Sequence, residues 1–293
     1  MVATTVRAVF VDLDGTLLNK DHALSDLTRD VLARLRRARP EVKLVVVTGR
    51  PHPHVLKLMS VLGLQPDYIV SNNGAVGHHG ETRECIFAHS LPVSTVHSLL
   101  RLPLPTSLTA DGNAEVVATA AAEVPVVAAN LFRAEEWVTT AMVAGLGASY
   151  RLGFHPRVEC DVTTREELWG DVYGFFFYGP HELLRPLEAT LQQRFADSVS
   201  VAFSLPFILD VGPAGVDKGS AVRDVLARLQ LRREDSIAFG DGMNDLAMLQ
   251  AVGRGYVMAN AAAELMAALP AMEVIGHHED DGVARKLIDL YDL

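Results

Sequence analysis

The sequence predicts an α/β protein whose parallel sheet is interrupted by an inserted α+β domain. Short apolar runs alternate with amphipathic helical stretches near both ends of the chain, which is the pattern of strands joined by crossover helices. Polar turns rich in Asp, Asn and Gly follow most of these runs, whereas the middle of the chain lacks such turns. The order therefore indicates one sheet that begins before the insertion and is completed after it.

The N-terminal part predicts three strands and two helices. The strands are expected at the apolar runs of residues 8–11, 42–47 and 68–70. Ser25 is expected to cap the first helix, which ends at Pro40. The second helix is expected to open at Pro51 and to stop at Gly63. This alternation is typical of a parallel sheet, whose ligands gather at the carboxyl ends of the strands.

Residues 84–205 are predicted to form the inserted α+β domain, which follows a hairpin near residues 78–81. Helices are expected near Pro92, near Ala134 and after Pro180. Strands are expected at residues 124–128, where an alanine-rich stretch ends, and in the aromatic run 173–178. This aromatic run is interpreted as a core strand rather than as a ligand-stacking surface.

The parallel pattern is expected to resume at residue 206, so residues 1–83 and 206–293 are predicted to form one core domain. Further strands are expected at residues 207–211, 236–239, 255–258 and 272–275. Further helices are expected to begin at Lys218, Ala261 and Gly282.

Composition describes an ordinary globular chain: 49% of its 293 residues are hydrophobic and 21% are charged. The net charge of −10 and the lack of a basic stripe argue against a nucleic-acid partner. The two cysteines show no metal-binding spacing, and no window reaches the roughly 20 apolar residues of a membrane span. We therefore expect a cytoplasmic protein without nucleic-acid or membrane partners.

Two carboxylates stand at the end of the first predicted strand. Asp12 and Asp14 are two positions apart, so both side chains point the same way along an extended backbone. Two like charges beside a buried strand favour a divalent cation, and hard oxygen ligands suit Mg²⁺. Taken alone, this pair is explained equally well by a solvated turn.

The other strand ends add residues that suit phosphoryl transfer. The full set is Asp12, Asp14, Thr48, Lys218, Asp241, Asn244 and Asp245. Carboxylates can ligate a metal or attack phosphorus, and hydroxyl, ammonium and amide groups can hold phosphoryl oxygens. Thr48 and Lys218 alone would indicate a turn and a solvated surface residue, and Asp245 could instead cap a helix. The residues themselves do not decide which aspartate attacks.

In this order, the motifs resemble those of the haloacid dehalogenase superfamily of phosphatases, in its Cof-type (IIB) branch. The four motifs are Asp12-Leu13-Asp14-Gly15-Thr16, Thr48-Gly49-Arg50, Lys218-Gly219 and Gly240-Asp241-Gly242-Met243-Asn244-Asp245. Further matches are Asn73-Gly74-Ala75, Asn260-Ala261 and Asp281-Gly282-Val283-Ala284. The resemblance covers both ends of the chain and implies a Rossmann-like core with an inserted C2-type cap. Within the cap there is no residue-level motif.

The resemblance also implies a role for each site residue. Asp12 would be the nucleophile, and Asp14 would be the general acid for the leaving alcohol and then the base that activates water. Mg²⁺ would be held by Asp12, the backbone carbonyl of Asp14 and Asp241, with Asp245 in support. Phosphate would be held by Thr48, Lys218 and Asn244, helped by backbone N–H groups around Leu13 and Gly49. Candidates for substrate contact are Arg50, Asn73 and Gly74.

The resulting prediction is a Mg²⁺-dependent phosphatase for small phosphomonoesters, such as sugar phosphates or related metabolites, that acts through an aspartyl-phosphate. A sugar phosphomutase would use the same intermediate, and a non-catalytic phosphate sensor could share the scaffold. The cap is expected to close over the strand ends and to recognise the leaving group. The protein is expected to be a monomer or a homodimer.

Overall fold

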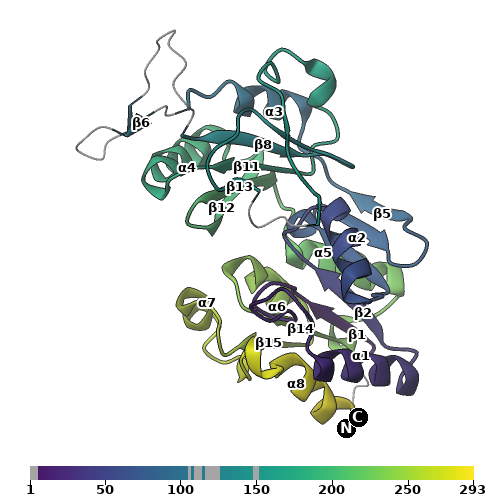
Figure 1. The fold of residues 1–293 in the computed structure, drawn as a ribbon. Coiled ribbons are helices and arrows are strands. Elements are labelled where there is room, and N and C mark those ends of the chain that lie inside the picture. The colour runs from purple at the N-terminus through teal and green to yellow at the C-terminus, as the bar shows by residue number, and fades with distance from the viewer. Residues whose placement is uncertain (1–5, 105–106, 109–113, 116–125, 148–151) are drawn as a thin grey trace. The chain divides into compact units, whose positions relative to one another are not determined.

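The computed structural model describes residues 6–104, 107–108, 114–115, 126–147 and 152–293, and the chain divides into two compact units (Figure 1). The first unit comprises Met1–Arg50, Leu58–Phe87 and Val216–Leu293, and the second comprises Pro51–Lys57 and Ala88–Gly215. In the part of the chain that the structure describes, no helix combines the length and the apolar character that crossing a membrane requires.

The first unit is built on an eight-stranded sheet with the order β16-β15-β14-β1-β2-β3-β4-β5. Its strands are β1 (Ala8–Val11), β2 (Lys43–Val47), β3 (Tyr68–Ser71), β4 (Val76–His79), β5 (Cys85–Ala88), β14 (Ser236–Gly240), β15 (Arg254–Met258) and β16 (Glu273–Ile275). All pairings from β3 to β16 are parallel, and β4 turns back antiparallel to β3. The parallel sheet is therefore confirmed. The hairpin expected near residues 78–81 is confirmed as well: it joins the neighbouring strands β4 and β5, and the His79 N–H bonds to the Glu84 carbonyl at 2.9 Å.

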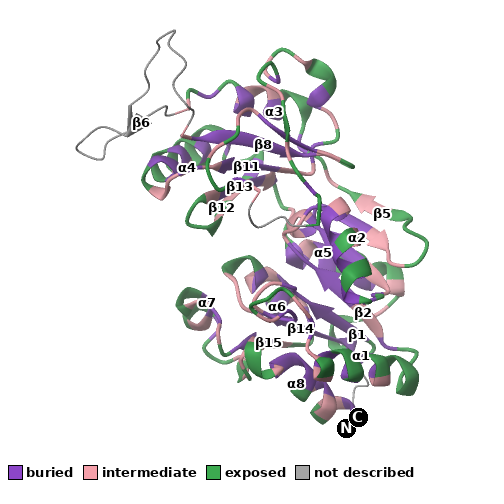
Figure 2. Ribbon diagram, in the orientation of Figure 1, coloured by how far each residue is buried: buried purple, intermediate pink, exposed green. Residues whose placement is uncertain are grey.

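Among the described residues, six helices accompany this sheet, and the second of them begins in residues 52–57, which are grouped with the second unit. They are α1 (Asp26–Ala38), α2 (His52–Leu62), α5 (Lys218–Leu229), α6 (Leu246–Ala251), α7 (Ala263–Ala268) and α8 (Gly282–Tyr291). Ser25 caps α1 as predicted, because its hydroxyl accepts the N–H of Thr28 at 2.9 Å. All residues of β1 and β14 are buried (Figure 2), which explains why both strands read as continuous apolar runs.

The second unit contains a six-stranded sheet with the order β10-β9-β8-β11-β13-β12. Its strands are β8 (Ala128–Phe132), β9 (Trp137–Thr139), β10 (Arg157–Val158), β11 (Gly174–Tyr178), β12 (Val199–Leu205) and β13 (Ile208–Pro213). Its other elements are α3 (Val93–Leu100), α4 (His181–Phe195) and the short pair β6 (Ser107–Leu108) and β7 (Ala114–Glu115). The helices expected near Pro92 and after Pro180 are confirmed.

The aromatic run of β11 contributes to two clusters, because successive side chains of a strand point to opposite faces. Phe175 and Phe177 belong to the main core of the unit, to which α3 and α4 also contribute. Phe176 packs in a smaller aromatic cluster with Phe132 and Trp137. The interpretation of this run as a core strand is confirmed.

The strand expected at residues 207–211 was assigned to the wrong sheet. It forms β13, which lies antiparallel between β11 and β12 in the second unit. Its residues alternate between buried and partly exposed positions, as in an antiparallel strand with one packed face. Asp210 stands in the middle of this run, and its charge would be costly in a strand buried on both faces. The second unit consequently extends past residue 205 to Gly215.

The helix expected near Ala134 is also wrong. Residues 133–136 form the turn of a hairpin between β8 and β9, closed by the N–H of Arg133 bonding to the carbonyl of Glu136 at 2.9 Å. Trp137 and the β-branched residues that follow it favour a strand at this position. The strand expected at residues 124–128 begins at Ala128, and most of the alanine-rich stretch lies outside the described residues.

Asp210 leads to a prediction about stability. Burial raises its pKa from 3.8 to about 6, and a hydrogen bond from Ser204 opposes this rise only in part. The folded state therefore binds the Asp210 proton more tightly than the unfolded state does, so stability falls as the pH rises from about 4 to about 6. We expect Asp210→Asn to raise the free energy of unfolding at pH 8 by up to about 3 kcal/mol.

Urea unfolding of the wild type and the variant at pH 5 and pH 8 measures this effect. The gain should be smaller at pH 5 than at pH 8, because the wild-type side chain is then mostly protonated. A gain of equal size at both pH values would contradict the prediction.

Candidate active site

The polar residues predicted from the strand ends lie in the first unit, at the carboxyl edge of its sheet. Asp12 follows β1, Thr48 follows β2, Asn73 lies in the 3₁₀ turn η1 (Asn72–Gly74) after β3, and Asp241 follows β14. Because β1 lies between β14 and β2, the turns after these strands are neighbours in space. The sheet thus assembles residues that are far apart in the sequence.

Lys218 connects two of these turns through a buried ion pair. Its ammonium Nζ donates to Oδ1 of Asp12 and to Oδ1 of Asp245, each at 2.7 Å. Lys218 is the first residue of α5, and the carboxylate of Asp217 caps this helix by accepting the N–H of Ser220 at 2.7 Å. The Lys218 side chain is only 1% exposed, so this cation depends on its two carboxylate partners.

Asp245 organises the turn that follows β14. Its Oδ2 accepts the backbone N–H groups of Asp241 at 2.9 Å and Gly242 at 3.0 Å, while its Oδ1 accepts from Lys218. The alternative that Asp245 caps the following helix is wrong, because its side chain makes no capping hydrogen bond to α6. Its observed bonds hold Lys218 and the turn in place, and its role as a metal ligand stays a prediction.

Two residues outside the predicted site orient Asp241. The hydroxyl of Thr16 donates to Oδ1 of Asp241 at 2.9 Å. The side-chain amide of Asn260 donates to the carbonyl of Gly15 at 2.7 Å and approaches Oδ2 of Asp241 at 3.4 Å. Gly15 has a positive φ of 75°, and a Cβ there would lie 2.2 Å from the Asp241 carboxylate. Only glycine fits this turn.

Negative charge exceeds positive charge at this site. Burial raises the pKa of Asp12 well above its ordinary value; the charge of Lys218 opposes this rise, and the neighbouring carboxylates add to it. Burial and the charge of Asp245 raise the pKa of Asp241 to about 6. Three carboxylates thus face one ammonium, a formal balance of −3 + 1 = −2.

This charge balance fits a divalent metal ion. Asp12, Asp241 and Asp245 each offer one carboxylate oxygen, and these three oxygens lie within 4.8 Å of one another. Hard divalent cations prefer such oxygen ligands. Asp14 is absent from this group of side chains, and its contribution to a metal site through its backbone carbonyl stays a prediction.

The Asp14 carboxylate is instead held by Arg50 and His22. Arg50 donates from Nε to Oδ2 and from Nη2 to Oδ1, each at 2.6 Å, in a two-point ion pair. The His22 Nδ1 lies 2.9 Å from the same Oδ1. Burial on its own raises the pKa of Asp14, but the hydrogen bonds from Arg50 and His22 outweigh it and hold the pKa below its ordinary value.

A third group of predicted residues meets at the turn after β3. Asn72 and Asn73 have positive φ values of 50° and 52°, and φ of Gly74 is 106°, so three successive residues are left-handed. The Asn73 N–H donates to the Thr48 carbonyl at 3.0 Å. The Asn73 Oδ1 accepts from the Asn244 amide at 3.0 Å. This strained turn thus connects the ends of β2, β3 and β14.

Gly49 and Gly74 permit close approaches in the same region. A Cβ on Gly49 would lie 3.0 Å from the Asn73 side chain, and one on Gly74 would lie 2.2 Å from the Asp217 carbonyl oxygen. The second approach brings the turn after β3 against the start of α5, where Lys218 begins.

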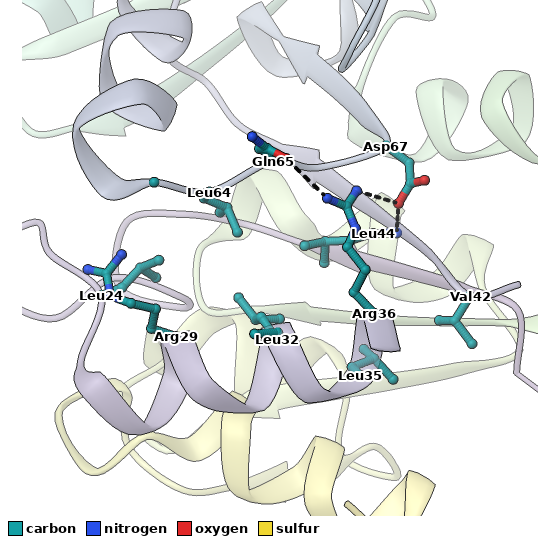
Figure 3. Close-up of a pocket in the computed structure, with 12 residues that line it drawn as sticks. Leu24, Arg29, Leu32, Leu35, Arg36, Val42, Leu44, Leu64, Gln65 and Asp67 are labelled. Carbon is teal, nitrogen blue, oxygen red and sulfur yellow. Dashed lines mark hydrogen bonds and ion pairs between the residues drawn. The ribbon is translucent and has the colours of Figure 1, made fainter. Parts of the chain in front are cut away.

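A separate pocket of about 190 Å³ lies beside α1, among the residues drawn in Figure 3. Leu32 of α1, Val42 and Leu44 of the β2 segment, and Leu64 supply apolar lining. Val42, Leu44 and Leu64 lie near the starts of β2 and β3, which is the edge of the sheet opposite to the carboxylates. On its rim, Asp67 already accepts the N–H of Leu44 at 3.0 Å. This pocket is therefore not the candidate active site.

The chain belongs to the haloacid dehalogenase-like hydrolases, because the sequence profile of that family matches residues 9–287. A Serratia proteamaculans protein named HMP-PP phosphatase is 34% identical over 284 residues, which cover 96% of this chain and 94% of that protein. These findings confirm the resemblance noted in the motifs. They also show that the protein is a phosphatase of the phosphoric monoester hydrolase class.

Solved structures agree with the observed fold. The crystal structure of a haloacid dehalogenase-like hydrolase from Bacteroides thetaiotaomicron has a TM-score of 0.79 at 26% identity, covering 98% of this chain and 100% of that chain. A subclass IIB sugar phosphatase of the superfamily has a TM-score of 0.74 at 18% identity, with coverage of 98% and 100%. The second likeness concerns the fold alone.

The structure joins the predicted residues into two hydrogen-bonded groups. The first contains Asp12, Lys218, Asp241 and Asp245. The second contains Asp14, Arg50, Thr48, Asn73 and Asn244, because the Arg50 N–H also donates to Oγ1 of Thr48 at 3.2 Å. Leu13 is buried between the two aspartates of the first motif. The roles assigned to these residues stay predictions.

Sequence reasoning did not assign site roles to Thr16, His22 and Asn260. Thr16 and Asn260 stood within recognised motifs, so their position was a usable signal. His22 stood outside every motif.

Lys218 leads to a prediction about the stability of the metal-free protein. Lys218→Met would leave the carboxylates of Asp12 and Asp245 buried without their cation. We expect the free energy of unfolding to fall by about 3–5 kcal/mol, the usual cost of breaking a buried ion pair. Urea unfolding in buffer containing EDTA measures this loss.

The matched control is Lys43→Met, which removes a partly exposed lysine that pairs with Asp67 at 3.1 Å. Its cost should stay below about 1 kcal/mol, because exposed ion pairs contribute little. Equal losses in the two variants would show that the burial of Lys218 does not determine its contribution.

Proposed function

We propose that the protein is a Mg²⁺-dependent phosphatase that hydrolyses small phosphomonoesters, such as sugar phosphates or related metabolites, through an aspartyl-phosphate on Asp12. The observation that carries this proposal is the position of Asp12. It stands at the end of a fully buried strand, with Oδ1 held by Lys218 and with Asp241 close by. A carboxylate held in this way is oriented for attack on a phosphoryl group.

In the first step, a carboxylate oxygen of Asp12 forms a bond to phosphorus while the bond from phosphorus to the leaving oxygen breaks. Asp14, which must first take up a proton because Arg50 and His22 hold its pKa low, gives this proton to that oxygen, so an alcohol leaves. In the second step, water attacks the phosphorus of the aspartyl-phosphate and gives a proton to Asp14. The acyl-phosphate bond breaks, inorganic phosphate leaves and Asp12 is restored.

Other residues of this chain would hold the phosphoryl group. Thr48, Lys218 and Asn244 supply hydroxyl, ammonium and amide donors, and backbone N–H groups around Leu13 and Gly49 add to them. When bound by Asp12, Asp241 and the Asp14 carbonyl, with Asp245 in support, Mg²⁺ would offset charge on the phosphoryl oxygens. The surplus of two negative charges at the site supports this proposal.

We also propose that the second unit acts as a cap domain that recognises the leaving group. The groups suited to metal and phosphate all come from the first unit, which leaves recognition of the rest of the substrate to other residues. HMP-PP, for which the Serratia relative is named, therefore belongs in a substrate panel beside sugar phosphates. The cytoplasmic location and the monomeric or homodimeric state stay predictions.

Phosphate release from a panel of sugar phosphates, nucleotides and HMP-PP tests the proposed function. We expect release that requires Mg²⁺ and stops with EDTA. Asp12→Asn should lower it by about a thousandfold or more, because the amide cannot attack phosphorus. Asp289→Asn, a change on the exposed side of α8, is the matched control and should leave the rate unchanged.

Product analysis distinguishes the alternatives. Conversion of a hexose 1-phosphate into its isomer without free phosphate would indicate a mutase. Turnover that survives Asp12→Asn would refute the aspartyl-phosphate mechanism.

Metal binding can be measured without catalysis. Mg²⁺ should raise the thermal unfolding temperature of the wild type, because a ligand that binds only the folded state stabilises it. Asp241→Asn should remove most of this rise, since it deletes a carboxylate from the proposed site. An unchanged Mg²⁺-dependent rise in this variant would place the metal elsewhere.

A further inference from the structure

We propose that His22 is a positioning residue for catalysis: together with Arg50, it holds the Asp14 carboxylate in the orientation needed to transfer a proton to the leaving group. This inference rests on the proposed function, in which Asp14 serves the leaving alcohol. His22 belongs to none of the sequence motifs and lies eight positions after Asp14.

Three donor groups surround the Asp14 carboxylate. Arg50 reaches both oxygens, from Nε to Oδ2 and from Nη2 to Oδ1, and His22 approaches Oδ1 from a third direction at 2.9 Å. The Arg50 side chain is 11% exposed, whereas Asp14 is 40% exposed and His22 is 48% exposed. Arg50 therefore forms the buried side of this clamp, and His22 restrains the carboxylate on the side that solvent and substrate can reach.

The distances indicate which nitrogen of the His22 imidazole carries the hydrogen. His22 Nδ1 lies 2.9 Å from Oδ1 of Asp14 and 3.3 Å from Nη2 of Arg50. A guanidinium only donates, so Nδ1 would need a lone pair to bond to Arg50 and a hydrogen to bond to Asp14. The shorter distance and the negative charge of the carboxylate favour donation to Asp14. We therefore assign the tautomer with hydrogen on Nδ1.

This arrangement makes the two Asp14 oxygens unequal. Among the residues that the structure describes, Oδ1 accepts from both Arg50 and His22, while Oδ2 accepts from Arg50 alone. Each carboxylate oxygen has about two acceptor positions. The second position of Oδ1 is occupied by His22, so Oδ2 keeps the free position. His22 thus directs proton exchange with the leaving group to Oδ2.

The backbone holds His22 in this position at a conformational cost. Its φ is 54°, a left-handed conformation that residues other than glycine seldom adopt. The Asn19 side chain accepts the N–H groups of Asp21 and Ala23, each at 3.0 Å, and the His22 N–H bonds to the Asn19 carbonyl at 2.9 Å. These bonds stabilise a turn that aims the imidazole at Asp14. An unusual conformation retained beside a reactive group is typical of functional sites.

The choice of substrate gives a test that a structural role would not pass. An alkyl phosphate has a poor leaving group that needs a proton, whereas p-nitrophenyl phosphate releases a stable phenolate that needs none. We expect His22→Ala to lower kcat/KM for an alkyl phosphate by about tenfold or more, as expected when an acid is misplaced. The fall for p-nitrophenyl phosphate should be under about threefold.

His22→Asn is the conservative variant. Its side-chain amide can donate at the position of Nδ1, and asparagine tolerates the left-handed conformation. With the alkyl phosphate, His22→Asn should recover most of the kcat/KM that His22→Ala loses. Asp21→Ala, at an exposed position of the same turn, is the matched control and should leave kcat/KM unchanged for both substrates. In an Asp14→Asn background, His22→Ala should add no further loss.

The outcomes separate this inference from the function on which it rests. If the wild type hydrolyses neither ester, both the proposed function and this inference are overturned. If the wild type is active but His22→Ala lowers kcat/KM equally for both substrates, or changes kcat/KM for neither, only the positioning role is overturned. A loss confined to the alkyl phosphate and rescued by His22→Asn supports it.

Discussion

The site depends on one buried ion pair, in which Lys218 lies between Asp12 and Asp245. The three residues come from the start of α5 and from the ends of β1 and β14, so the contact forms only when the sheet and its helices are assembled. Gly219 makes this assembly possible: a Cβ there would lie 2.5 Å from the carbonyl oxygen of Ala247, so glycine lets α5 pack closely against α6. The fold and the geometry of the candidate site are thus linked through this ion pair.

The same contact leaves the site electrostatically incomplete. Lys218 offsets only one of the three clustered carboxylates, and burial makes the remaining charge costly. Hydrogen bonds from Thr16 and from the turn after β14 reduce this cost but add no positive charge. The protein therefore keeps charges that are unfavourable for stability alone, in an arrangement that a divalent cation and a phosphoryl group would complement.

Sequence reasoning succeeded where a contiguous motif coincided with a strand end. Asp12, Thr48 and Asp241 follow parallel neighbours, and parallel topology brings such residues together without knowledge of any side-chain contact. It failed for β13, because an apolar run does not reveal its partner, and antiparallel pairing with β11 depends on distant residues. It also missed His22, whose contact with Asp14 requires a left-handed turn that no periodicity predicts.

Close backbone approaches at the candidate site constrain residues of the first unit. Each unit has its own hydrophobic core, so the second unit can change its residues without disturbing the contacts around Lys218. In the first unit, Gly15 approaches the Asp241 carboxylate and Gly74 approaches the Asp217 carbonyl too closely for a side chain. Substitutions there would displace the turns that carry the carboxylates and donors. The proposed chemistry is therefore tied to these turns, and under the proposed cap role a change of substrate would come from changes in the insertion, away from the turns.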